Sequence, residues 1–356
     1  MSKTRIKMEF NLQKILRENI KNLVPYSSAR DEFKGEASVF LDANENSFGS
    51  PIEKQYNRYP DPLQLKVKQK LSQIKGVPPR NIFLGNGSDE AIDILFRAFC
   101  RPGIDNVITA PPTYGMYEVS ANINDVEVRK VNLTADYQLD LEGIAAAIDE
   151  NTKLIFICSP NNPTGNSMNR EDLETLLANF PGLVVIDEAY INYSRQKTFI
   201  QELTEYANLV VLQTLSKAWG LAGLRLGMAF ASEEIIEVFN RVKPPYNINE
   251  ASQQLALEAL NNLEQVNEWI KETLTERDKL VLDLKKMLFV VDIYPSDANF
   301  ILVKTIAAKE IYNFLVEKGI IVRDRSKVEL CEGCLRVTVG TPAENVTLIE
   351  SLKNFR

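Results

Sequence analysis

Short runs of β-branched and apolar residues alternate with longer amphipathic segments between about residues 62 and 260. Apolar runs of about four to eight residues bounded by turn residues are typical of buried strands, whereas apolar positions three and four apart are typical of helices. The pattern predicts helices such as 61–76, 89–99, 170–180 and 233–242. It also predicts seven strands, at residues 81–85, 106–110, 126–131, 153–159, 183–187, 208–214 and 227–231. This alternation favours a mainly parallel sheet that is covered by helices on both faces.

The pattern changes towards the C-terminus. One long helical pattern covers roughly 250–288. It is followed by strand patterns at 289–294, 299–305, 320–324 and 334–339. Helices are predicted at 308–319 and at the C-terminal end. We therefore predict an α/β fold with a large domain at 57–260, whose mainly parallel seven-stranded sheet is sandwiched by helices. An N-terminal arm (1–56) and a smaller α+β domain (261–356) complete the predicted organisation.

The overall charge argues against two classes of partner. The chain has 356 residues, a formal net charge of −7 and no sustained run of lysine and arginine, which disfavours binding to nucleic acid or to an anionic membrane surface. No apolar segment approaches the roughly 20 residues that span a bilayer. The N-terminus contains basic residues but lacks the apolar core of a signal peptide. We expect neither a nucleic-acid nor a membrane partner.

Histidine is absent, which excludes Ser-His-Asp and Cys-His devices and removes the commonest metal ligand. Proton transfers would have to use Lys, Tyr, Asp or Glu, and we expect no metal site. The four cysteines are Cys100, Cys158, Cys331 and Cys334. The last two form a C-x-x-C motif, which could be redox-active or half of a zinc site, but we predict a turn that enters the strand at 334–339. Reduced cysteines fit a cytoplasmic protein.

Polar motifs follow several of the predicted strands. The motif GNGSDE (85–90) places a glycine-rich turn before a helix that begins behind Ser88 and Asp89. Free N–H groups and the positive end of the helix dipole make such a turn an anion site in outline. Glu90 stands where the dinucleotide-binding fingerprint has its third glycine, so a dinucleotide site is not indicated. The alternative is that Ser88 only caps the helix.

Two further motifs also stand at the ends of predicted strands. SPNNPTG (159–165) directly follows a buried strand, where open α/β sheets bind their ligands, although a simple Pro/Asn turn has the same composition. Asp187 ends the apolar strand at 183–187, and Tyr190 follows three residues later. Aspartate is almost never fully buried without a partner. A structural ion pair is the alternative to a functional role for Asp187.

Lys217 stands just beyond the apolar run 209–215. Burying an unpaired ammonium costs several kcal/mol or forces the amine to become neutral. Lys217 therefore either reaches the surface or belongs to a site that uses a neutral amine. Because the strand ends of such a sheet share one edge, four side chains should converge there: Ser88, Asn162, Asp187 and Lys217.

A pocket that combines a lysine, a carboxylate, an aromatic ring and anion donors matches pyridoxal 5'-phosphate. This cofactor needs a lysine amine to bind its aldehyde, an acidic partner for its ring nitrogen and a cradle for its phosphate. Each motif alone has a structural explanation. The order in which the phosphate site, the carboxylate and the lysine follow one another along the chain is what specifically indicates a pyridoxal-phosphate site.

A set of longer segments extends this match over nearly the whole chain: LDANENSFGSP (41–51), NRYPDP (57–62), GNGSDE (85–90), PPTYGMY (111–117), SPNNPTG (159–165), DEAY (187–190), TLSKAWGLAGLRLG (214–227) and CLRVTVG (334–340). In these segments the chain resembles the aspartate-aminotransferase-like, type I pyridoxal-phosphate enzymes, and among them the histidinol-phosphate aminotransferases. The resemblance implies the type I fold of pyridoxal-phosphate-dependent transferases.

The resemblance also implies roles at the cofactor. Lys217 would bind the cofactor and act as the catalytic base, and Asp187 would keep the ring nitrogen protonated. Tyr190 and Asn162 would donate hydrogen bonds to the ring's phenolic oxygen, and Tyr114 would stack on the ring. The phosphate would be held by Gly87, Ser88, Asp89, Ser216 and Arg225. Tyr59 is expected to reach the cofactor of a neighbouring subunit, which implies a homodimer.

Further positions concern the substrate. Arg336 matches the arginine that binds the substrate carboxylate in amino-acid transaminases, and Arg323 matches an additional one in the histidinol-phosphate enzymes. Paired guanidinium groups suit a phosphate dianion, although a solvated charge is the alternative for Arg323. Tyr26 and Asn299 are further pocket candidates that could equally be packing residues.

The function that the resemblance implies is the transamination of histidinol phosphate with 2-oxoglutarate, which gives imidazole-acetol phosphate and glutamate in histidine biosynthesis. A phosphothreonine decarboxylase and a broad aromatic-amino-acid aminotransferase are alternatives. A regulator that senses pyridoxal phosphate is disfavoured, because only about 55 residues precede the first cofactor-related motif and leave no room for a DNA-binding module.

Overall fold

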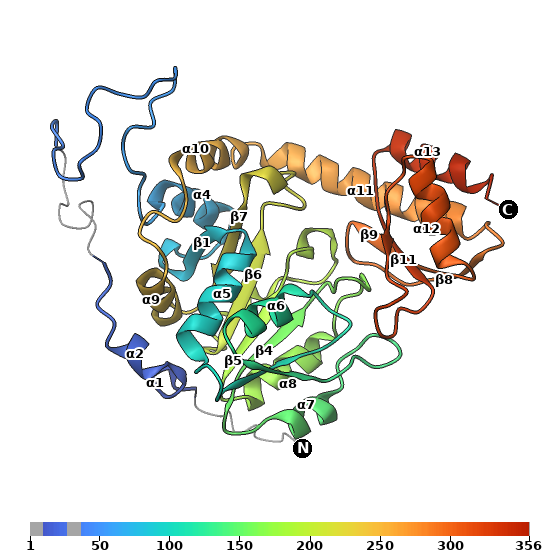
Figure 1. Ribbon diagram of the computed structural model, residues 1–356, viewed down its shortest axis with the longest axis horizontal. Coiled ribbons are helices and arrows are strands. Elements are labelled where there is room, and N and C mark those ends of the chain that lie inside the picture. Colours follow the sequence, from blue (N-terminus) through green and yellow to red (C-terminus); the bar gives the residue numbers. More distant parts are fainter. Residues whose placement is uncertain (1–9, 27–36, 356) are drawn as a thin grey trace.

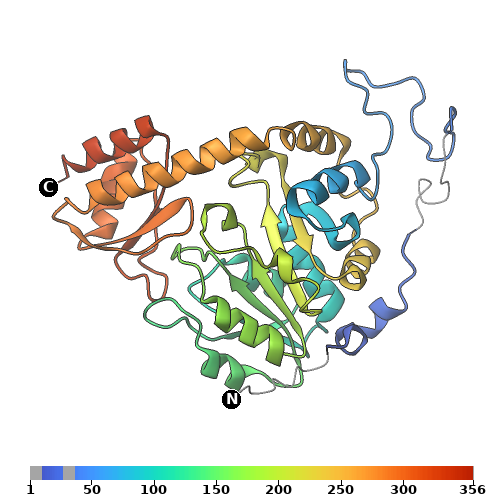
Figure 2. The ribbon, with the colours of Figure 1, turned by 180° about the vertical axis from the view of Figure 1, so that it is seen from behind.

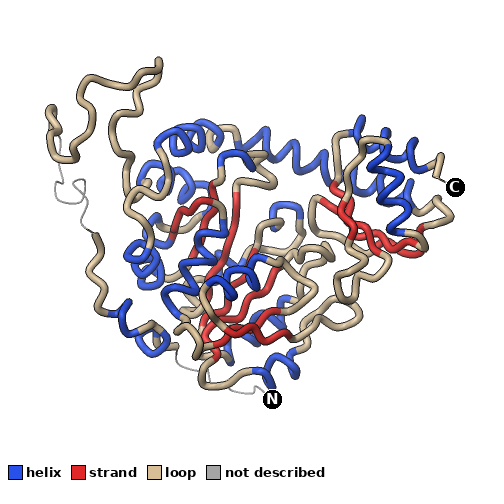
Figure 3. Tube along the Cα trace, viewed as in Figure 1, coloured by secondary structure: helices blue, strands red, loops and turns tan. Residues whose placement is uncertain are grey.

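The computed structural model describes residues 10–26 and 37–355. Two separate groups of strands, drawn in red in Figure 3, form a large and a small sheet. The strands of the large sheet are β1 (Ile82–Asn86), β2 (Asn106–Thr109), β3 (Glu127–Lys130), β4 (Thr152–Cys158), β5 (Leu183–Asp187), β6 (Leu209–Thr214) and β7 (Leu226–Phe230). The seven predicted strands are confirmed, each to within one residue at either end.

The large sheet has the order β1-β7-β6-β5-β4-β2-β3. The strands β2, β3, β4, β5 and β6 pair in parallel, whereas β7 runs antiparallel to both of its neighbours, β1 and β6. Four of these strands, β2, β5, β6 and β7, are buried along their whole length, and β4 is buried except at Lys153, as expected for strands with both faces covered. The predicted mainly parallel sheet is therefore confirmed, with one antiparallel strand inserted.

Helices cover both faces of the large sheet (Figure 1). Alternate residues along each strand face opposite sides, so Phe156 and Ile157, which are neighbours in β4, belong to two different core clusters. The helices here are α1 (Leu12–Ile15), α2 (Glu18–Lys21), α4 (Leu65–Lys75), α5 (Ser88–Phe99), α6 (Met116–Ile123), α7 (Leu141–Ala147), α8 (Arg170–Asn179), α9 (Glu233–Val242) and α10 (Glu250–Ala259). Apolar residues of α4, α7, α8 and α10 join one cluster, and those of α1, α2, α5, α6 and α9 join the other.

Short 3-10 helices complete this part of the chain. They are η1 (Pro79–Asn81), η2 (Ile191–Tyr193), η3 (Phe199–Glu202) and η4 (Ala222–Leu224). The helix η2 directly follows β5, and η4 precedes β7, so both lie close to the edge of the sheet where the polar motifs gather.

The small sheet is antiparallel with the order β10-β11-β9-β8. Its strands and helices are β8 (Val290–Ile293), β9 (Phe300–Thr305), α12 (Ala308–Glu317), β10 (Arg323–Asp324), β11 (Cys334–Thr338) and α13 (Pro342–Leu352). A turn at 332–333 leads from Cys331 into β11, as predicted for the C-x-x-C motif. Both of its cysteines are buried and free.

The long helical pattern at 250–288 is two helices rather than one. The helix α10 ends at Ala259, and α11 (Leu263–Leu284) begins after a break that contains Asn261 and Asn262. Both asparagine side chains donate to carbonyl groups four residues earlier, which is how such residues compete with continued helix formation. Helix α11 then links the two sheets (Figure 2): Val266 packs in the core of the large sheet, and Leu284 packs in that of the small sheet.

Candidate active site

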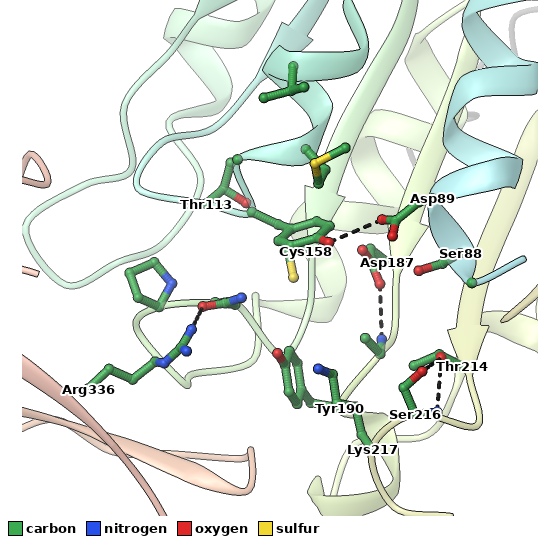
Figure 4. A pocket seen from close by; sticks show the side chains of 18 of the residues that line it. Ser88, Asp89, Thr113, Cys158, Asp187, Tyr190, Thr214, Ser216, Lys217 and Arg336 are labelled. Carbon is green, nitrogen blue, oxygen red and sulfur yellow. Dashed lines mark hydrogen bonds between the residues drawn. The ribbon is translucent and has the colours of Figure 1, made fainter. Parts of the chain in front are cut away.

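A cavity of about 560 Å³ lies where the carboxyl ends of the large-sheet strands face the small sheet. The segments that follow β1, β2, β4, β5 and β6 contribute to its walls, together with β10 and β11. This is the place where open α/β sheets bind ligands. Figure 4 shows that the labelled side chains Asp187, Tyr190, Lys217 and Arg336 reach this space from different elements.

The first turn of α5 forms one wall of the cavity. Gly87 precedes this helix with a φ of +73°, and among the described side chains none caps its first turn. A β-carbon at Gly227 would lie 2.1 Å from the Ser88 nitrogen, so only glycine permits β7 to approach the turn this closely. The amide groups at the start of α5 therefore remain available to an anion at the positive end of the helix dipole.

Polar side chains surround this helix terminus. Arg225 has a left-handed backbone with a φ of +55°, and its Nη2 lies 3.3 Å from Asp89 Oδ2. The Tyr114 hydroxyl donates to the other oxygen of Asp89 at 3.1 Å. Ser216 Oγ lies 2.9 Å from Thr214 Oγ1, which orients this hydroxyl at the end of β6. These groups form a compact cradle of hydrogen-bond donors.

Asp187 ends β5 and is 3% exposed. The Tyr117 hydroxyl donates to its Oδ2 at 2.8 Å, and the Ala189 amide donates to its Oδ1 at 3.0 Å. Burial raises the pKa of Asp187 to about 6, while these two hydrogen bonds oppose the rise. The carboxylate is therefore mostly ionised at pH 7 and can accept a hydrogen bond from a cationic partner.

Lys217 follows β6 and lines the cavity opposite Asp187. Its side chain is exposed to the open cavity, which answers the question of its burial: the ammonium is neither enclosed in the core nor directed to the outer surface. Among the described residues no hydrogen bond or ion pair occupies it, and its Nζ lies 5.6 Å from the centre of the Tyr190 ring. Surrounding protein, and then the charge of Arg336, lower the pKa of Lys217, which favours the neutral, nucleophilic amine.

The small sheet supplies the opposite wall. Arg336 in β11 donates from Nη1 to Asn162 Oδ1, and its guanidinium carbon lies 5.2 Å from the centre of the Phe300 ring. Phe300 also contacts Tyr190 edge to face, with ring centres 5.1 Å apart. These contacts hold Arg336, Asn162 and Tyr190 as one group and connect the two sheets across the cavity.

The structure brings together most of the predicted site residues. Those that line the cavity are Gly87, Ser88, Asp89, Tyr114, Asn162, Asp187, Tyr190, Ser216, Lys217, Arg225, Arg323 and Arg336. Tyr26, Asn299 and Tyr59 do not line it. Tyr26 is 75% exposed. Tyr59 is half exposed and stacks on Tyr246 with ring centres 4.5 Å apart.

Several residues of the site were not among those predicted from the sequence. Thr113, Cys158 and Arg325 line the cavity, and Tyr117 holds Asp187 from behind. The second tyrosine of PPTYGMY is the signal that was available for Tyr117. Cys158 is the register partner of Asp187 in the neighbouring strand, a relation that appears only once the strand order is known.

The comparisons with known proteins agree with this geometry. The family "Aminotransferase class I and II" matches residues 39–352, and the chain belongs to this family. It is therefore an aminotransferase that uses pyridoxal 5'-phosphate. Within residues 10–26 and 37–355, no helix is long and apolar enough to cross a membrane.

Particular relatives are more closely similar. The chain is 56% identical to the histidinol-phosphate aminotransferase of Cytophaga hutchinsonii over 98% of this chain and 100% of that protein. It is also 56% identical to the enzyme of the same name from Parabacteroides distasonis over 97% and 99%. Among solved structures, it resembles the histidinol-phosphate aminotransferase of Sinorhizobium meliloti in complex with pyridoxal-5'-phosphate, with a TM-score of 0.78, 24% identity and coverage of 87% and 90%. At this identity the structural likeness shows the fold.

The residues present fit pyridoxal phosphate. The uncapped first turn of α5, with Ser216 and Arg225 beside it, offers donors to a phosphate group. Asp187 offers an ionised carboxylate to a protonated ring nitrogen, and Lys217 offers an amine that no described carboxylate engages. When bound, the cofactor supplies an aldehyde that condenses with an amine and a cationic ring that withdraws electrons from the substrate's α-carbon.

Proposed function

We propose that this aminotransferase transfers the amino group of histidinol phosphate to 2-oxoglutarate, which gives imidazole-acetol phosphate and glutamate in histidine biosynthesis. One observation carries the substrate assignment: Lys217 faces a wall that presents Arg323 and Arg336 to the same cavity. Both substrates bear anionic groups at a distance from the reacting amine or carbonyl, and arginine binds phosphate and carboxylate through forked donors. The identity of 56% to enzymes named for this reaction supports the same assignment.

The side chains would divide the work as follows. Lys217 would bind the cofactor's aldehyde, and its amine would also move a proton at the substrate's α-carbon. Asp187 would hold a proton on the ring nitrogen. Tyr190 and Asn162 would orient the ring through its phenolic oxygen, and Tyr114 would cover one face of the ring. The lowered pKa of Lys217 suits an amine that must act both as nucleophile and as base.

The cradle around α5 would hold the cofactor's phosphate. Its members would be Gly87, Ser88, Asp89, Ser216 and Arg225. The backbone amides would provide most of the attraction, because Asp89 is itself acidic and pairs with Arg225. Tyr26 and Asn299 do not line the cavity. Their contact with the substrate stays a prediction.

A direct assay tests this function. The purified protein is incubated with histidinol phosphate and 2-oxoglutarate, and glutamate formation is measured. Phosphothreonine, with detection of carbon dioxide, and the aromatic amino acids serve as competing substrates. We expect the highest kcat/KM for histidinol phosphate. Carbon dioxide release from phosphothreonine without transamination of histidinol phosphate would identify a decarboxylase instead, and equal use of aromatic amino acids would indicate a broad aromatic aminotransferase.

We also propose that the active protein is a homodimer. Within the predicted arm at 1–56, residues 37–56 extend away from the body of the molecule (Figure 1). This segment exposes several large apolar side chains, among them Val39, Leu41, Phe48 and Ile52. An extended arm with this composition favours contact with a second copy of the chain.

Subunit mixing tests the role of Tyr59 in a dimer. We expect the Lys217→Ala and Tyr59→Ala proteins each to be inactive or weakly active. The two proteins are mixed after partial denaturation and refolding. If Tyr59 acts across the interface, a mixed dimer contains one complete site and activity returns to a fraction of the wild-type value. If Tyr59 acts within its own subunit, or not at all at the cofactor, mixing restores nothing beyond the level of the separate proteins.

We place the protein in the cytoplasm. Its four cysteines, Cys100, Cys158, Cys331 and Cys334, are all free and buried, which suits a reducing compartment. Burial raises the pKa of Cys331 to about 11, so this thiol stays protonated and unreactive at neutral pH.

A further inference from the structure

Three arginines form the side of the cavity that belongs to the small sheet. Arg323 in β10 and Arg336 in β11 are register partners in antiparallel strands, so their side chains are neighbours on one face of this sheet. Arg325 follows two residues after Arg323, and its amide continues the pairing by donating to the Cys334 carbonyl at 2.9 Å. Residues two apart in extended backbone point to the same face. All three arginines line the cavity that also holds Lys217.

The charge of these three arginines is not neutralised within the protein. Among the described residues, no carboxylate forms an ion pair with any of them. The Nε atoms of Arg325 and Arg336 are buried and have no hydrogen-bond partner. Burial, followed by the charge of Arg323, lowers the pKa of Arg325. Arg325 and Arg336 are partly buried, whereas Arg323 is exposed. Removing part of a cation from water without an anionic partner is costly unless a ligand compensates it, so this wall is suited to receive an anion.

The proposed function offers two anions of different charge. Histidinol phosphate carries a phosphate dianion, whereas the side chain of glutamate ends in a carboxylate of single charge. Arg336 has one nitrogen engaged by Asn162, while the Arg325 and Arg323 side chains have no hydrogen-bond partner among the described residues. Two free guanidinium forks match the charge and the acceptor oxygens of a phosphate better than those of a carboxylate.

We propose that Arg325 determines specificity, by binding the substrate's phosphate group together with Arg323, so that the site prefers phosphorylated substrates to dicarboxylic ones. This inference rests on the proposed function for the identity of the phosphorylated substrate. It assigns to the phosphate a residue, Arg325, that lies just beyond the end of β10. It also predicts that loss of the Arg325 side chain raises KM for histidinol phosphate more than KM for glutamate.

The first experiment compares Arg325→Gln with Lys327→Gln in the holoenzyme. Lys327 is exposed, lies on the same loop and does not line the cavity, so its substitution removes the same charge without removing a ligand. We expect Arg325→Gln to raise KM for histidinol phosphate by about 10- to 100-fold, the loss typical of one charge-assisted hydrogen-bonding group. KM for glutamate should change by less than about threefold, and Arg325→Lys should recover part of the loss.

Two outcomes overturn the inference. One is an equal rise of KM for histidinol phosphate and glutamate, which would make Arg325 a general anion contact. The other is a change no larger than that of Lys327→Gln. Thermal unfolding provides a check on folding: removal of a partly buried, unpaired charge should leave the Tm of the Gln variant unchanged or higher.

Inorganic phosphate separates this inference from the proposed function. Its affinity for the holoenzyme, where the cofactor already fills the cradle at α5, is measured by calorimetry for the wild type and both variants. We expect the Arg325→Gln protein to bind phosphate at least about tenfold more weakly than the Lys327→Gln protein. This result would support the phosphate role of Arg325 even if histidinol phosphate were not a substrate. Equal phosphate affinity in the two variants would overturn it even if the transamination assay succeeded.

Discussion

The hydrogen bond from Tyr117 to Asp187 makes a prediction about pH. Both residues are buried, and the hydroxyl donates to the carboxylate at 2.8 Å. Tyr117→Phe removes this donor and leaves the ring, which stacks on Phe156 with centres 4.9 Å apart. The substitution therefore changes the electrostatic environment of one carboxylate with little change in packing.

The size of the expected effect follows from the pKa of Asp187 in the folded and unfolded protein. Its pKa in the folded protein is about 6, against the ordinary aspartate value of 3.8, and this rise corresponds to roughly 3 kcal/mol of destabilisation at neutral pH. A hydrogen bond to a charged group contributes about 1.5–3 kcal/mol. Removing it should raise the pKa of Asp187 by a further one to two pH units, to roughly 7–8.

The sign of the pH dependence is fixed by which state binds the proton more strongly. Between pH 3.8 and about 6 the folded protein keeps the proton of Asp187 after the unfolded chain has lost it, so the free energy of unfolding contributed by this group falls as pH rises. In the wild type this fall ends near pH 6. In Tyr117→Phe it should continue to roughly pH 7–8, with an additional loss of about 1.5–3 kcal/mol.

The assay is urea unfolding of the cofactor-free protein at pH 5.5 and pH 8. Tyr193→Phe is the matched control, because Tyr193 is also buried and its hydroxyl donates to no described carboxylate. We expect the difference in unfolding free energy between the wild type and Tyr117→Phe to grow between these pH values, and the difference for Tyr193→Phe to stay constant. Parallel pH profiles for the two variants would refute the reasoning about Asp187.

Three other substitutions, one of them with a matched control, test separate parts of the site. Asp187→Ala should retain cofactor but lose kcat by on the order of 100-fold or more, measured with cofactor content as the control; a near-normal rate would place the partner of the ring nitrogen elsewhere. Gly227→Ala should cost roughly 1–3 kcal/mol of stability and weaken cofactor binding, because its β-carbon would lie 2.1 Å from the Ser88 nitrogen. Gly223→Ala, whose β-carbon would meet no atom within 4 Å, should bind cofactor normally, and equal effects of the two would contradict the close approach. Arg323→Ala should raise KM for histidinol phosphate more than KM for glutamate, and equal losses would make it a general anion contact.

The large sheet was predictable because most of its strands are buried on both faces, although β3 is not. Such strands appear as continuous apolar runs, and the edge of the sheet that carries the polar motifs then follows from their order along the chain. For this reason Ser88, Asn162, Asp187 and Lys217 could be expected at one cavity before the fold was known. The break between α10 and α11 was less visible, since Asn261 and Asn262 interrupt an amphipathic pattern only slightly.

Contacts between distant elements were not predictable in the same way. Tyr117 lies in α6 and looks like one more apolar position of that helix, and its role appears only when β5 is placed beside it. Arg325 stands next to Asp324, which suggests a local charge pair, yet its guanidinium group lines the cavity. Side-chain direction in irregular backbone depends on tertiary packing that a pattern of residue types does not encode.

The proposed chemistry depends first on the amine of Lys217, which would carry the cofactor. Reduction of the holoenzyme with borohydride, followed by proteolysis and mass spectrometry, locates the amine to which the cofactor is bound. We expect a single modified peptide that contains Lys217, and no modification in the Lys217→Ala protein. Labelling of a different lysine in the wild type, or unchanged labelling of the Lys217→Ala protein, would contradict it.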